Sequence, residues 1–154
     1  MKNVFRSWAM PAAMLVSTCG GEPPTDGPQT VTPAVAPAVA TATVTIGSPD
    51  EGETLMTDAV TVRLSVEGMQ IVPAGDTTSG TGHHHLYLDA DLAAPGTPVP
   101  TVPGSIIHMG DGSSEYTFEG VAPGEHRLIA VVADGIHIPL NPAVVDTVMF
   151  TVNN

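Results

Sequence analysis

The fold of this chain is decided by the stretch Val60-Thr61-Val62-Arg63-Leu64-Ser65-Val66-Glu67, in which apolar and polar residues alternate strictly. Successive side chains of a β-strand point to opposite faces, so the alternation predicts a strand with one face toward a core and the other toward solvent. Turns rich in Gly, Pro, Asn and Asp separate this stretch from other short apolar runs, and no run has the three-and-four spacing of an amphipathic helix. We therefore expect an all-β protein.

Further strands are predicted on both sides of this stretch. Ala42, Val44 and Ile46 share one face of a first strand, and later strands are expected at 83–89, 106–109, 115–119, 125–133 and 148–152. The segment 125–133 is apolar on both faces, which is typical of a central strand. About seven short strands in a domain of this size indicate an immunoglobulin-like antiparallel β-sandwich, with a small barrel or jelly roll as the alternative.

The N-terminus is predicted to be an export signal. Lys2 and Arg6 precede a short apolar run, and the only cysteine, Cys19, follows Val16-Ser17-Thr18. This pattern resembles a bacterial lipobox, in which the cysteine is lipidated and becomes the first mature residue; the alternative is an ordinary signal peptide cut nearby.

Three parts of the chain are therefore expected. Residues 1–18 form a lipoprotein-type signal peptide, residues 19–40 a disordered tether rich in Pro, Thr and Ala, and residues 41–154 the β-sandwich. This organisation predicts a protein of the bacterial cell envelope, anchored to a membrane by its lipid alone and facing the periplasm or the outer surface.

The charge of the chain limits the classes of molecule that it can bind. It has 4 basic and 16 acidic residues and a formal net charge of −12, and loss of residues 1–18 leaves Arg63 and Arg127 as its basic residues. A phosphate-neutralising surface cannot be built from two arginines, so nucleic acid is excluded and anionic lipid is disfavoured. Metal ions or cationic ligands are electrostatically favoured, although an acidic surface can also serve solubility alone.

Three consecutive histidines begin one predicted strand, in Gly82-His83-His84-His85-Leu86. By strand alternation, His83 and His85 share one face and form half of a metal site. His84 shares the other face with Leu86 and is expected to lie in the core.

The predicted topology completes this half site. If the strands 83–89 and 125–133 are antiparallel neighbours, His83 and His85 lie near the loop that carries His137. We therefore predict a copper or zinc site with His83, His85 and His137 as ligands and His108 as an additional ligand. Met109 or Met69 near the site would favour Cu(I). Structural hydrogen bonding and a proton-dependent switch are the alternatives.

His126, which begins its strand at the opposite end, is expected to pack or hydrogen-bond there. Asp89 and Asp91 form an Asp-x-Asp pair, but without the ligand spacing of a calcium loop.

The sequence is also compatible with two other classes of function. A metal-dependent hydrolase would need three imidazoles on one centre and an adjacent carboxylate, and the sequence has no nucleophile elbow or phosphate-binding loop to assign a catalytic residue. A structural or adhesion-like module would instead dock a protein partner on an exposed face formed by Ile129 and Val131.

The order of the histidine-bearing motifs resembles the bacterial domain-of-unknown-function family 4399. The resemblance is carried by Gly82-His83-His84-His85-Leu86, His108-Met109-Gly110-Asp111-Gly112, Pro123-Gly124-Glu125-His126-Arg127-Leu128, Asp134-Gly135-Ile136-His137-Ile138-Pro139 and Asn141-Pro142. It implies a small exported all-β domain of no established activity, with all six histidines as motif residues. Pro142-Ala143-Val144 departs from the Pro-Pro-Val expected in that family, which affects a turn.

Overall fold

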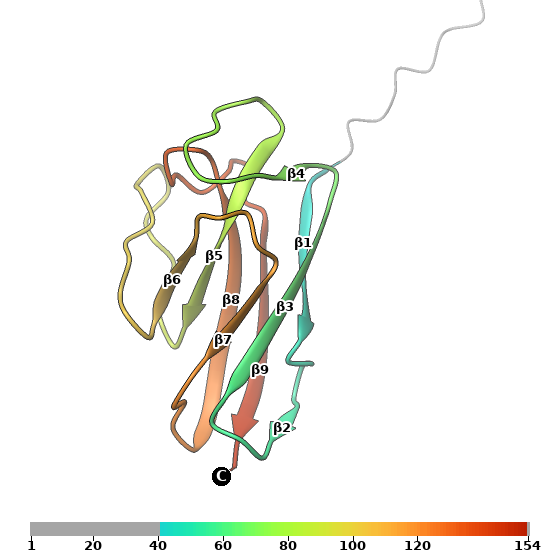
Figure 1. Cartoon of the computed structure of the whole chain (residues 1–154), viewed down its shortest axis with the longest axis vertical. Helices are drawn as coiled ribbons and strands as arrows, with labels where there is room; N and C mark the ends of the chain where they lie inside the picture. The colour runs from blue at the N-terminus through green and yellow to red at the C-terminus, as the bar shows by residue number, and fades with distance from the viewer. Residues whose placement is uncertain (1–40, 154) are drawn as a thin grey trace, which may run out of the picture. The chain divides into compact units, whose positions relative to one another are not determined.

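The computed structural model describes residues 41–153, so the predicted signal peptide, Cys19 and the tether lie outside the described residues (Figure 1). The described chain is built from strands, turns and loops, and has no helix that could span a membrane. Its strands are β1 (Thr43–Ser48), β2 (Thr54–Leu55), β3 (Val60–Glu67), β4 (Gln70–Ile71), β5 (Thr81–Leu88), β6 (Ile106–Met109), β7 (Glu115–Phe118), β8 (Gly124–Ala133) and β9 (Val145–Val152).

The strands form two sheets, which confirms the predicted all-β sandwich. The smaller sheet has the order β1-β3-β7, and the larger one β2-β9-β8-β5-β4, with β6 also paired to β5 (Figure 1). β3 is the alternating stretch: Val60, Val62 and Leu64 are buried, whereas Arg63 and Ser65 are exposed. The two-residue strands β2 and β4, both in parallel pairs, were not predicted, because two residues carry no periodicity.

The inward faces of the two sheets form the main core. β5, β8 and β9 contribute alternate residues from the larger sheet, and β1, β3 and β7 contribute those of the smaller sheet. The most completely buried members include Val62, Leu86, Leu128, Ala130 and Val132, all at 0% exposure. Burying a valine or leucine fully stabilises the fold by roughly 1.5–3 kcal/mol.

A second apolar cluster covers the outer face of the larger sheet and overturns one prediction. Ile129 and Val131, which the interaction-module hypothesis required to be exposed, are only 6% and 3% exposed and pack with Tyr87 and Val99. The loop 89–105 folds back over them and is held there by a hydrogen bond from Val99 N to His137 O (2.8 Å). Strand alternation identified the face correctly but could not reveal the loop that covers it.

The register of β5 places the histidines. β5 is antiparallel to β8, with His83 opposite Ala133 and His85 opposite Val131, so the start of β5 lies beside the loop that follows β8. On its other side, β5 is antiparallel to β6, with His85 opposite His108. The predicted pairing of these two long strands is confirmed.

Candidate metal centre

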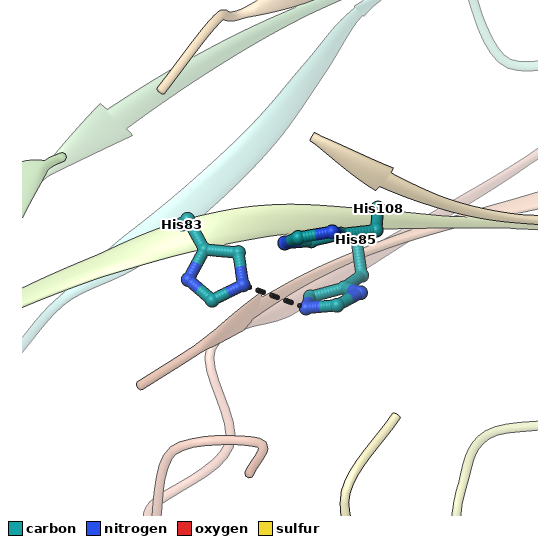
Figure 2. Close-up of side chains that lie close together, drawn as sticks. All are labelled: His83, His85 and His108. Atoms are coloured by element: carbon teal, nitrogen blue, oxygen red, sulfur yellow. Dashed lines mark hydrogen bonds between the residues drawn. The ribbon is translucent and has the colours of Figure 1, made fainter. Parts of the chain in front are cut away.

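His83 and His85 project together from the outer face of β5. Both side chains are 0% exposed, and their Nε2 atoms are 3.0 Å apart (Figure 2). The spacing of two residues on a strand enforces this, because side chains return to the same face with period two. The predicted His-x-His pair is therefore present.

His108 comes from β6 and joins this pair. Its ring centroid lies 4.9 Å from that of His83 and 5.1 Å from that of His85, and the rings of His85 and His108 are stacked (Figure 2). One nitrogen from each of the three rings lies within 4.8 Å of the others, so the group could hold a metal ion. Gly110 makes room for the His108 ring, since a Cβ there would lie 2.5 Å from His108 Nε2.

His137 reaches the same cluster from the loop after β8. Its Nε2 lies 3.2 Å from His108 Nε2, and its ring centroid lies 5.0 Å from that of His83 and 5.7 Å from that of His85. The structure thus brings together all four histidines predicted for the site. His137 has a φ of 71°, a left-handed conformation that non-glycine residues rarely adopt and that often marks a functional constraint.

Asp134 shapes the loop that presents His137. Its Oδ1 accepts hydrogen bonds from Ile136 N (3.0 Å) and Ile138 N (2.9 Å), and its carbonyl oxygen accepts one from His137 N (2.9 Å). Asp134 directly follows Ala133, and Ala133 lies opposite His83 in the pairing of β8 with β5. The loop that carries His137 therefore begins next to the cluster.

Burial keeps the buried imidazoles neutral. Loss of solvation, together with the neighbouring His108 and His137, lowers the pKa of His83 to about 4. Loss of solvation and the proximity of His83 lower the pKa of His85 to about 3. Burial also lowers the pKa of His108. Neutral imidazole is the form that binds metal, so protons do not compete for these nitrogens near neutral pH.

Two of the nitrogen separations are close to those of a first-row transition-metal site. Four ligands at the usual metal–imidazole distance would place neighbouring nitrogens about 3.3 Å apart in a tetrahedron. The two Nε2 separations of 3.0 Å and 3.2 Å are close to that value. The Nδ1 atoms of His83 and His85 are buried without a hydrogen-bond partner, and a metal ion held by the Nε2 atoms would leave them without one.

The two candidate thioether ligands lie elsewhere. Met109 is opposite His84 in the β5–β6 register, and its side chain is buried in the core between the sheets. Met69 packs against the same core. Neither methionine therefore shares the outer face with the cluster, since neighbouring residues such as His108 and Met109 face opposite sides of β6.

His84 and His126 take the positions outside the cluster that the sequence predicts. His84 is 1% exposed and faces the core, and burial lowers its pKa to about 4. His126 stacks on Phe150 at the other end of β8, where Asp89 Oδ2 and Ala122 O each lie 2.7 Å from one of its ring nitrogens.

The Asp-x-Asp pair, Asp89 and Asp91, serves this same end of the domain. Asp89 binds His126 and the backbone N of Arg127, and Asp91 pairs with the Arg127 side chain at 2.6 Å. The two carboxylates thus hold the end of β5 to the start of β8.

Sequence reasoning did not identify the supporting roles of Gly110 and Asp134. Gly110 is only two residues from His108 in the sequence. The close approach of its backbone to the His108 ring, however, depends on the tertiary structure and cannot be inferred from that proximity. For Asp134, the Asp-Gly dipeptide indicated a turn. Neither signal identified the ring that the residue positions.

The fold and the cluster together define a β-sandwich domain with a buried group of histidines on the outer face of one sheet. The family model described as "Domain of unknown function (DUF4399)" matches residues 62–153, and the chain belongs to this family. No curated protein matches the chain.

Two solved structures are similar to part of the chain. One is an engineered protein, with a TM-score of 0.42, 16% identity and coverage of 76% of this chain. The other is the endo-beta-1,4-mannanase from Thermotoga petrophila, with a TM-score of 0.45, 16% identity and coverage of 77%. The chain spans 21% of the length of each of them.

Proposed function

We propose that this protein is an exported, lipid-anchored β-sandwich that binds one transition-metal ion, copper or zinc. His83, His85 and His108 are the ligands from the sheet, and His137 is the fourth ligand, supplied by a loop. The convergence of four imidazole rings, with nitrogen pairs at 3.0 Å and 3.2 Å, carries this proposal.

The chemistry of the donors favours Zn(II) or Cu(II). All four donors are imidazole nitrogens, which suit both ions, and the two thioethers that would favour Cu(I) pack in the core. The acidic chain, with a net charge of −12, raises the local concentration of cations.

Calorimetric titration of the full chain with Zn(II) and Cu(II), with metal analysis of the dialysed product, tests the site. We expect uptake of one ion per chain, and a loss of at least about tenfold in affinity in His108→Asn and in His137→Asn, both at partly exposed positions. His126→Gln, a histidine change outside the cluster, should bind as the wild type does. Absence of stoichiometric uptake would refute the proposal, as would unchanged uptake in a His83→Ala/His85→Ala variant that remains folded.

Export and anchoring are supported by the sequence around Cys19. Lys2 and Arg6 precede the apolar run Ser7 to Val16, which ends shortly before this cysteine. Mass spectrometry of the protein from bacterial membranes should find a diacylglyceryl group on Cys19 as the first residue, and Cys19→Ser should shift the protein to the soluble fraction. An unmodified Cys19 in the mature protein would contradict this part of the proposal.

A metal-dependent hydrolase is a second candidate, favoured by the position of Asp134 beside the cluster. Its carboxylate is close enough to His83 to oppose the lowering of that pKa. A zinc-loaded chain that hydrolyses p-nitrophenyl acetate, with loss of activity in His83→Ala/His85→Ala, would support this candidate. Equal rates for the loaded and metal-free chains would exclude it for that substrate class.

A further inference from the structure

An apolar hollow of about 360 Å³ lies on the outer face of the larger sheet, beside β8 and β9. The loop segments 92–96 and 138–143 form its sides, and the larger side chains that line it are Leu92, Val131, Ile138, Leu140 and Val145. Leu92 and Val145 are 46% and 40% exposed. Exposed apolar surface gathered around a concave site is typical of ligand-binding grooves.

The hollow is separate from the histidine cluster, although it is close to it. None of the described residues that line it is a histidine. Val131 lies opposite His85 in the register, and Ile138 directly follows His137. The two sites therefore share the outer face of the larger sheet but present different chemistry.

The lining determines what kind of molecule fits. Among the described residues around the hollow none is charged, and Asn141 supplies the one polar side chain. An anion would lose its hydration there and gain no partner, in a chain that is already strongly acidic. The volume is near the lower end of the range of about 300–1,000 Å³ found for small-molecule sites.

We propose that this hollow binds a small, uncharged, predominantly apolar organic molecule. The apolar body of the ligand packs against Leu92, Val131 and Val145, and the Asn141 amide makes its polar contact. Binding covers the two exposed apolar side chains at the rim, and this burial drives association. The inference does not depend on metal binding, so either proposal can fail without the other.

Fluorescence titration of the full chain with N-phenyl-1-naphthylamine, an uncharged apolar probe, tests this site. We expect a saturable rise in emission, and binding weaker by at least about tenfold for the sulfonated analogue 8-anilinonaphthalene-1-sulfonate, because its charge has no partner in the hollow. An absence of saturable binding, or equal binding of the two probes, would overturn the proposal.

Two substitutions then locate the probe. Ala143→Phe places a ring in the hollow from an exposed position and should weaken binding at least about tenfold, as should Val145→Phe. Met149→Phe adds the same ring at an exposed position of β9 outside the hollow and should have no effect.

Unchanged affinity in both Ala143→Phe and Val145→Phe would overturn the assignment. It would also fall if sedimentation showed self-association of the wild-type chain that Ala143→Phe abolishes, because a second copy would then be the occupant.

Discussion

Replacement of His84 by leucine is expected to stabilise the protein increasingly as the pH falls. His84 is 1% exposed in the core, and burial lowers its pKa from 6.5 to about 4. In the unfolded chain, His84 gains its proton at a higher pH than in the folded chain. The wild type therefore loses stability as the pH falls from the unfolded value toward the folded one.

The magnitude follows from the size of the shift. A displacement from 6.5 to about 4 corresponds to roughly 3 kcal/mol once the pH is below both values, and to about 2 kcal/mol near pH 5. Leucine does not titrate and is similar in size to histidine. It also removes a buried Nδ1 atom that has no hydrogen-bond partner, so His84→Leu should be no less stable than the wild type at neutral pH.

Urea unfolding of the full chain, followed by circular dichroism with a chelator present, measures this effect. The difference in unfolding free energy between His84→Leu and the wild type should grow by about 2 kcal/mol between pH 7 and about pH 5. Titration of His83 and His85 occurs in both proteins and largely cancels in the difference, because His84 is the weakest of the influences that lower their pKa values. If the difference in unfolding free energy does not change with pH, the conclusion that His84 is neutral and buried in the core is refuted.

Three further outcomes are expected. Burial opposes protonation of His126, but the hydrogen bonds to Asp89 and Ala122 outweigh burial and raise its pKa. The loss of stability caused by His126→Gln should therefore be largest below about pH 6.5 and should shrink as the pH rises through the pKa of the folded state. Thermal melts at a series of pH values would measure this loss. Gly110→Ala should displace His108 and weaken metal binding at least about tenfold in calorimetry, whereas Gly47→Ala, where the nearest atom to a new Cβ is 3.7 Å away, should not. Asp134→Ala should weaken metal binding more than Asp134→Asn, which keeps an oxygen acceptor for the loop; equal losses would show that the charge, and not the loop geometry, matters.

The sequence was sufficient to predict the faces of the long strands. The alternation of β3 predicted which of its residues are buried, and the two-sided apolar pattern of β8 predicted its central place between β5 and β9. From the expected pairing of β5 with β8 in the usual order of a sandwich, the approach of His137 to His83 could be inferred. Such inferences succeed because the period of a strand is fixed by its backbone geometry.

What the sequence did not predict depends on loops. The burial of Ile129 and Val131 comes from the loop 89–105, whose path has no periodic signal. The contact between Gly110 and the His108 ring arises because the chain turns back on itself directly after β6. Loops follow contacts made after the sheets have formed, so local patterns carry little information about their positions.

The alternation of β5 places the residues of the His83-His84-His85 run in two separate environments. His83 and His85 face the loops and the proposed metal, whereas His84 faces the core, where it is a source of acid sensitivity. Substitutions at the two outer positions should therefore change both metal affinity and the pH dependence of stability, whereas a substitution at the middle position should change only the pH dependence of stability. Burial lowers the pKa of all three imidazoles, so acid disfavours both faces of the strand. The run is better described as half of a metal site interleaved with one core residue than as a single histidine cluster.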